Sequence, residues 1–182
     1  MMSPSAKPWQ KAAINPEMGA AVYEPTVVAN VIKQAKKPIL VIGAMSLRWK
    51  VGDELYIDVL LRLARAANLP IVATAHSNKH ISKGENGDLE VHVLPLVNLT
   101  NRLEDGQAWN GLDGSGKPDL VIFAGITTYY VSQMLAVTKN FSETLQTLTI
   151  DAEYQPNARF SLGNVSKKEW KSFFDDLIEI FS

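Results

Sequence analysis

Three short runs of apolar, mostly β-branched residues divide the chain, and helical patterns separate them. The runs are PILVIG (Pro38–Gly43), PIVAT (Pro70–Thr74) and PDLVIFAG (Pro118–Gly125). Continuous apolar strands of this kind are typical of parallel sheets that are covered on both faces. A fourth run, Leu145–Asp151, alternates polar and apolar residues, so we expect it nearer a sheet edge, and residues 158–164 are a candidate fifth strand.

Helical periodicity fills the intervals between these strands. In the last helix Ser166 and Glu169 have the spacing of a capping box, which predicts that the helix begins there. Asp53 is the expected cap of an earlier helix, and the polar stretch 75–90 is expected to be a long connection. The predicted helices cover residues 24–37, 53–68, 94–103, 129–141 and 166–181.

Strands that alternate with helices of this length predict βαβ units with right-handed crossovers. We therefore predict an α/β fold, a three-layer doubly wound parallel sheet of the Rossmann-like kind. Residues 1–23 show no clear periodicity and are expected to form an N-terminal arm, followed by a single Rossmann-like α/β domain over 24–182.

Composition narrows the function classes. The chain has no cysteine, which excludes disulfides, thiolate zinc sites, cysteine-bound iron–sulfur clusters and cysteine nucleophiles. Its 18 basic and 19 acidic residues are not arranged in blocks, so we expect no nucleic-acid partner and no membrane partner. No secretory or membrane-spanning run is present, and we expect a cytoplasmic protein.

Ligands of doubly wound sheets lie outside the carboxyl ends of the strands. The residues there that we predict to bind a cofactor are Gly43, Met45, Thr74, Gly125 and Thr127. Neither glycine belongs to a G-x-G-x-x-G or Walker sequence, so both also have a purely structural interpretation as tight turns. Likewise, the hydroxyls of Thr127, Thr128 and Ser46 could bind a dinucleotide phosphate or could be helix caps. Trp49, Tyr129 and Tyr130 could stack on a ring or anchor a protein interface.

Other candidate sites have weaker support. Gly111, Gly114 and Gly116 precede their strand, so a turn is favoured over a phosphate loop, and the acidic residues nearby lack calcium-loop spacing. His76, His80 and His92 are expected to be exposed loop residues. No catalytic motif such as G-x-S-x-G or H-E-x-x-H is present, so we predict no catalytic residue and no metal site.

Several stretches together resemble the epsilon subunit family of the archaeal acetyl-CoA decarbonylase/synthase complex. The resemblance runs from Asn15 to the closing helix, and Leu47–Gly52 departs from the expected first loop. Its most specific residues are Trp109, Gly111–Gly114, Gly116, Asp119–Phe123, Gly125, Tyr130, Lys139–Phe141 and Pro156–Ala158.

This resemblance implies a deoxyhypusine-synthase-like NAD/FAD-binding fold. It also implies an alpha2-epsilon2 heterotetramer with the large carbon monoxide dehydrogenase (alpha) subunit, which carries the nickel and iron–sulfur clusters. Two roles are implied for the small subunit, namely stabilisation of that partner and electron transfer to FAD.

The leading hypothesis is therefore a non-catalytic subunit, with no enzyme activity of its own, that docks through its arm and exposed aromatic residues. The alternative adds FAD at Gly43, Met45, Thr74, Gly125 and Thr127. A third hypothesis, a sirtuin-like NAD-dependent deacylase, requires a G-A-G-I-S turn, of which Gly43–Ser46 provides only a fragment.

Overall fold

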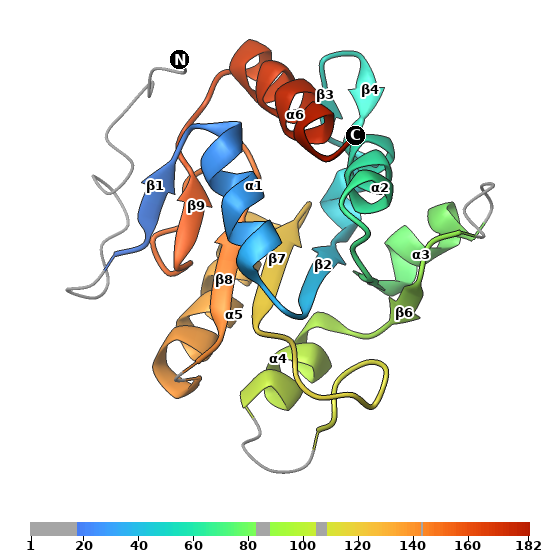
Figure 1. Ribbon diagram of the computed structural model, residues 1–182, viewed down its shortest axis with the longest axis vertical. Coiled ribbons are helices and arrows are strands. Elements are labelled where there is room, and N and C mark those ends of the chain that lie inside the picture. The colour runs from blue at the N-terminus through green and yellow to red at the C-terminus, as the bar shows by residue number, and fades with distance from the viewer. Residues whose placement is uncertain (1–17, 83–87, 105–108, 143) are drawn as a thin grey trace.

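A seven-stranded parallel sheet forms the centre of the molecule in the computed structural model, which describes residues 18–82, 88–104, 109–142 and 144–182. The strand order is β1-β9-β8-β7-β2-β5-β6 (Figure 1). This arrangement confirms the predicted α/β, Rossmann-like fold. The strands are β1 (Ala20–Val22), β2 (Pro38–Ile42), β5 (Ile71–Ala73), β6 (Val91–Val93), β7 (Leu120–Ala124), β8 (Gln146–Thr149) and β9 (Phe160–Leu162).

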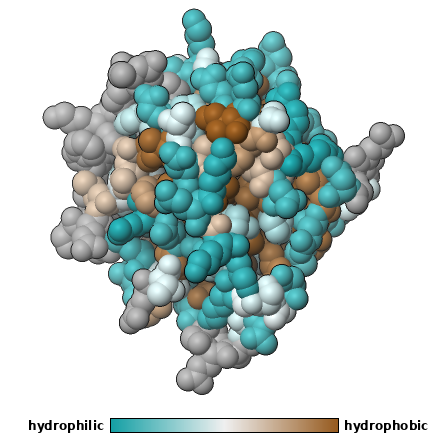
Figure 2. Space-filling view, in the orientation of Figure 1, coloured by the Kyte–Doolittle hydropathy of each residue, from teal (hydrophilic) through white to brown (hydrophobic). Residues whose placement is uncertain are grey.

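Helices cover both faces of the sheet. Helices α1 (Pro25–Gln34), α2 (Tyr56–Ala66) and α6 (Lys167–Phe181) lie on one face, and α4 (Leu96–Glu104) and α5 (Thr128–Phe141) lie on the other (Figure 1). Figure 2 shows the α1 and α6 face as mostly hydrophilic, with apolar side chains visible between polar ones. None of the helices in the described part of the chain is long and apolar enough to cross a membrane.

The alternation of side chains along each strand separates two cores. In β7, Leu120, Ile122 and Ala124 contribute to the cluster under α1, α2 and α6, whereas Val121 and Phe123 contribute to the cluster under α4 and α5. All five are at most 1% exposed. Because each fully buried side chain of this size contributes about 2 kcal/mol, a continuous apolar strand is favoured only where both faces are covered.

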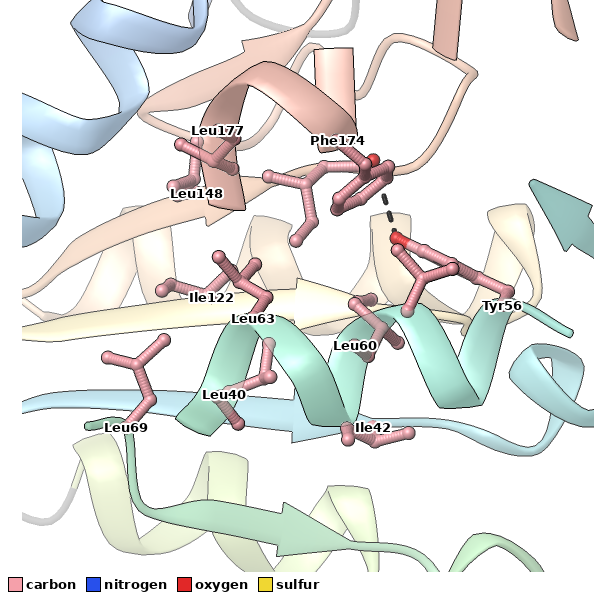
Figure 3. Close-up of a cluster of buried hydrophobic side chains, with 14 of the residues drawn as sticks. Leu40, Ile42, Tyr56, Leu60, Leu63, Leu69, Ile122, Leu148, Phe174 and Leu177 are labelled. Atoms are coloured by element: carbon pink, nitrogen blue, oxygen red, sulfur yellow. Dashed lines mark hydrogen bonds between the residues drawn. The ribbon is translucent and has the colours of Figure 1, made fainter. Parts of the chain in front are cut away.

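The first of these cores is the larger (Figure 3). Leu60 and Leu63 of α2 and Leu177 of α6 pack over the strands at helical spacing, and all three are fully buried. Ser166 caps α6 as predicted: its hydroxyl accepts from the Glu169 amide at 3.3 Å, and the Glu169 carboxylate accepts from the Ser166 amide at 2.8 Å.

Residues 50–55 correct the predicted start of the second helix. They form a short hairpin, β3 (Lys50–Val51) and β4 (Glu54–Leu55), joined by a two-residue turn, and α2 begins only at Tyr56. Gly52 has a φ of 63°, the left-handed value that a type II′ turn requires at this position. Asp53 therefore lies in the turn and does not cap α2.

The stretch 75–90 also differs from the expected connection. Residues Ala75–Ile81 form helix α3, and residues 83–87 lie outside the described part. Only two residues of α3, Ser77 and Ile81, are buried, so its sequence lacks the apolar stripe that identifies a helix. Strand β6 was likewise not predicted, and its three residues are only partly covered.

Two further corrections concern strands. Ala20–Val22, within the segment expected to be an arm, pairs with β9 as an edge strand, whereas residues 1–17 lie outside the described part. Strand β8 is interior and not near an edge. Its polar side chains point to neighbours: the Thr149 hydroxyl donates to the Ser161 hydroxyl at 2.8 Å, and Thr147 accepts from the Arg159 amide at 2.9 Å.

Candidate functional site

The winding of the sheet reverses between β2 and β7, so their carboxyl ends form the switch point at which such folds bind ligands. The structure brings three of the five predicted cofactor residues together there. The Gly43 amide donates to the Ala124 carbonyl at 2.9 Å, and the Met45 amide donates to the Gly125 carbonyl at 2.9 Å. The short 3-10 helix η1 (Ala44–Leu47) is thereby held across the end of β7.

The two glycines allow this close approach. A Cβ atom on Gly43 would lie 2.4 Å from the Gly125 carbonyl oxygen, and one on Gly125 would lie 2.6 Å from the Ser46 Cβ. Gly125 also has a φ of 65°. The Ser46 side chain is fully buried, and its hydroxyl donates to the Gly43 carbonyl at 2.7 Å. Backbone and side chains of the protein itself therefore fill the switch point.

A phosphate at such an edge is held by backbone amides that the loop leaves free. The amides of Gly43 and Met45 already donate to carbonyls, and the Gly125 amide donates to the Asp151 carboxylate at 2.9 Å. These residues therefore do not fit a phosphate cradle in this arrangement. FAD at the predicted residues stays a prediction that the geometry does not favour.

The two predicted threonines lie on either side of this point. Thr74 precedes α3, and its hydroxyl lies 3.0 Å from the Ser77 hydroxyl. Thr127 precedes α5 without making a side-chain capping bond. The next residue, Thr128, donates its hydroxyl to the Glu153 carboxylate at 2.7 Å. Neither predicted threonine therefore acts as a side-chain helix cap.

A cavity of about 510 Å³ lies at the same edge of the sheet, beside the switch point. It opens between the β3–β4 hairpin, the segment after β8 and the start of α6. Its lining combines two tryptophans, three cations and two carboxyl groups with neutral residues. The lining residues are Arg48, Trp49, Lys50, Gly52, Thr128, Asp151, Ala152, Glu153, Gln155, Val165, Lys167 and Trp170.

The Asp151 carboxyl has the most perturbed environment in this cavity. It is only 6% exposed, and burial raises its pKa to about 7. The Gly125 amide, the Tyr56 hydroxyl and the Ile126 amide favour the ionised form and limit the rise, whereas the nearby Glu153 charge adds to it. Asp151 can therefore exchange a proton near neutral pH.

Tyr56 connects Asp151 to the main core. Its side chain is fully buried, and burial together with the Asp151 charge raises its pKa well above the usual value. Its hydroxyl donates to the Ile150 carbonyl at 3.3 Å, the contact drawn in Figure 3. The carbonyl of Ile150 also accepts from the Trp170 indole at 2.9 Å. The Tyr56 hydroxyl and the Trp170 indole N–H therefore both have a hydrogen-bond acceptor at the end of β8.

Aromatic rings form the wall between the cavity and the core. Trp49 stacks on Tyr56 with ring centroids 6.4 Å apart, and Tyr56 lies 4.5 Å from Trp170 in a tilted arrangement. Phe174 completes the group, 5.6 Å from Tyr56 and 5.9 Å from Trp170. Such pairs stabilise by about 1 kcal/mol each beyond area burial, so this wall is a rigid surface.

Sequence reasoning found only part of this cavity. It identified the strand ends and noticed that the loop Leu47–Gly52 is unusual, but it assigned no role to Asp151, Gln155 or Lys167. The available signal was the sequence Arg48-Trp49-Lys50, an aromatic ring between two cations directly after a buried strand. The other residues come from distant parts of the chain, and only the fold brings them together.

The histidines are placed differently from the expectation. His76 and His80 lie on α3, not in a loop, and His80 pairs with Asp58 of α2 at 3.1 Å. His92 lies in β6, 2.7 Å from Glu90. Within the described ranges, no group of three or more histidine, aspartate and glutamate side chains is arranged to hold a metal ion.

The glycine-rich stretch before β7 is a turn, as predicted. Gly111, Gly114 and Gly116 have φ values of 83°, 80° and 124°, which are left-handed conformations. The stretch is anchored by Lys37, whose ammonium donates to the Ser115 hydroxyl at 2.9 Å. It lies at the amino ends of the strands, opposite the switch point.

Comparisons with known proteins identify relatives over nearly the whole chain. Residues 3–180 match the family described as CO dehydrogenase beta subunit/acetyl-CoA synthase epsilon subunit. The chain is 39% identical to the acetyl-CoA decarbonylase/synthase complex subunit epsilon 1 of Archaeoglobus fulgidus, over 90% of this chain and 85% of that one. It is 35% identical to the subunit epsilon 1 of Methanosarcina barkeri, over 85% of each chain. It is 32% identical to the subunit epsilon of Methanothermobacter thermautotrophicus, over 93% of each chain.

Proposed function

Because the chain belongs to the family of CO dehydrogenase beta subunits and acetyl-CoA synthase epsilon subunits, we propose that it is the epsilon subunit of an acetyl-CoA decarbonylase/synthase complex. In this role it binds the large carbon monoxide dehydrogenase subunit and stabilises it, and it has no catalytic activity of its own. The assembly that we propose contains two large and two small subunits.

The observation that carries the accessory role is the filled switch point. In a doubly wound enzyme this crevice holds the ligand. Here the Gly43–Gly125 contact and the buried Ser46 side chain occupy it. The fold is therefore better explained as a rigid body that presents its surface to a partner. The chain also contains no cysteine, so it provides no thiolate to an iron–sulfur cluster.

The outer surface of α5 is the part of the described structure that we propose to contact the partner. Tyr129 and Phe141, at opposite ends of this helix, are 70% and 71% exposed. Between them Met134, Ala136 and Val137 are only partly buried. Aromatic and methionine side chains are enriched in protein interfaces, which supports this surface as the docking face.

Copurification from native cell extract tests this proposal. The chain carries an affinity tag and is isolated without oxygen, and the eluate is analysed for nickel, iron and subunit ratio. We expect a large subunit that contains nickel and iron–sulfur clusters to elute with it in equal amount. Elution of the tagged chain by itself, at the size of a monomer, would contradict the proposal.

A further inference from the structure

The cavity beside the switch point has the composition of a ligand site, although of its residues only Trp49 was predicted from the sequence to stack on a ring. Its volume of about 510 Å³ lies within the usual range for small-molecule sites. It is separate from the predicted cofactor residues, of which it includes none. The β3–β4 hairpin forms one side, and the first turn of α6 forms another.

Three cations line this cavity without partners. Arg48, Lys50 and Lys167 make no ion pair and no side-chain hydrogen bond with any other residue in the described ranges. The cations outnumber the two carboxyl groups of the lining even when both are ionised. The rim therefore attracts an anion, and the positive end of the α6 dipole adds to this attraction.

The side-chain amide of Gln155 provides the second feature. The Gln155 side chain is only 3% exposed and lines the cavity, yet its amide has no hydrogen-bond partner among the residues that the structure describes. Its backbone is fixed, because its amide N–H donates to the Ser161 hydroxyl at 2.9 Å. A side-chain amide without a protein partner offers a donor and an acceptor side by side, which complements the edge of a heterocycle.

The third feature is a flat apolar surface. The Trp49 ring stacks on Tyr56, with ring centroids 6.4 Å apart, and Trp49 also lines the cavity. Because Tyr56 is fully buried and Trp170 is 4% exposed, this surface is held rigidly. A planar ring can stack here at low entropic cost.

We propose that this cavity binds an organic anion of mononucleotide size. A planar heterocycle lies beside Trp49, its polar edge meets the Gln155 amide, and its anionic group lies between Arg48, Lys50 and Lys167. The proposal does not rest on the accessory role, since a subunit with or without a partner could bind such a ligand. It places the ligand away from Gly43 and Gly125.

Isothermal titration of the full chain with FMN and with AMP tests this proposal. Riboflavin, adenosine and inorganic phosphate serve as comparison ligands that carry only the ring or only the anion. We expect at least one of the two nucleotides to bind about tenfold more tightly than its unphosphorylated form and than phosphate, because both contacts contribute. If neither nucleotide binds at millimolar concentration, the proposal is wrong.

Two neighbouring lysines give a matched pair of variants. Lys167 lines the cavity, whereas Lys168 is also exposed but lines a different depression. We expect Lys167→Gln to weaken nucleotide binding about fivefold or more and Lys168→Gln to change it less than about twofold. Both variants should keep the wild-type circular dichroism spectrum. Equal weakening by both would show non-specific attraction to the helix end and overturn the proposal.

Discussion

The backbone of Gly43 lies so close to Gly125 that a Cβ atom on Gly43 would be 2.4 Å from the Gly125 carbonyl oxygen. These residues directly follow β2 and β7, the two strands that flank the switch point. The contact explains why each strand needs a glycine here even though neither belongs to a phosphate-binding motif. It joins the two halves of the sheet at the edge where related folds leave an opening for a ligand.

The first prediction follows from this contact. Gly43→Ala should lower the free energy of unfolding by about 2–4 kcal/mol, because the new methyl group meets backbone atoms that cannot move independently. Gly114→Ala is the control: its φ is 80°, but no atom lies within 4 Å of an added Cβ, so only the cost of about 1 kcal/mol for the left-handed conformation applies. Urea unfolding measures the free energy of unfolding of both variants. Equal losses in the two variants would contradict the close contact.

The second prediction concerns the pH dependence of stability. The Asp151 pKa is about 7 in the fold, against about 3.8 for an exposed aspartate, because burial disfavours the charged form. The native state therefore binds more protons than the unfolded state between about pH 4 and pH 7. Asp151 then makes stability fall as the pH rises through this window, by up to about 4 kcal/mol in total, and adds no further change above it.

Asp151→Asn tests this relationship, because asparagine keeps an oxygen acceptor for the Gly125 amide but does not titrate. We expect the variant to lose less stability than the wild type between pH 5 and pH 8. Urea unfolding at several pH values gives the two slopes. If the slopes are the same, other groups cause the pH dependence and the account of Asp151 is wrong.

The third prediction concerns the docking of α3. The Ser77 side chain is fully buried, and its hydroxyl lies 2.8 Å from the Ile42 carbonyl and 3.0 Å from the Thr74 carbonyl. Ser77→Ala should lower the free energy of unfolding by about 1–2 kcal/mol and speed hydrogen exchange in α3. Ser82→Ala, at the exposed end of the same helix, should change stability by less than about 0.5 kcal/mol. Unchanged exchange in the Ser77 variant would show that α3 is held by other contacts.

The fourth prediction tests the proposed partner surface. Tyr129→Asp combined with Phe141→Asp should reduce the amount of large subunit that copurifies, by about tenfold or more, because two exposed rings are replaced by charges. Val27→Asp is the matched control, since Val27 is 43% exposed on α1, on the opposite face of the sheet. Circular dichroism checks that each variant folds. If both variants retain the partner equally, the interface does not lie on the outer surface of α5.

Much of the fold could be predicted because its strands are buried on both faces. Such strands read as continuous apolar runs, and the five main helices carry clear apolar stripes. The capping box of Ser166 and Glu169 located the start of α6 to the residue. Helix α3 could not be predicted in this way, because a buried serine hydroxyl, rather than an apolar stripe, holds it in place.

Less of the candidate site could be predicted from the sequence. The strand ends were correctly located, yet the amides of Gly43 and Met45 are engaged by contacts with residues about 80 positions away in the chain, which no local pattern reveals. The cavity depends on Lys50, Gln155 and Lys167, which come together only through the order of strands β2, β7, β8 and β9. A lone glutamine in a loop gives no signal until its burial is known.

We propose that this chain stabilises a carbon monoxide dehydrogenase subunit. The most direct test is the thermal inactivation of carbon monoxide oxidation by the large subunit, measured without oxygen in the presence and absence of an equimolar amount of this chain. We expect a longer half-life when the chain is present, with little change in the initial rate. Identical half-lives at concentrations at which the two proteins form a complex would contradict it.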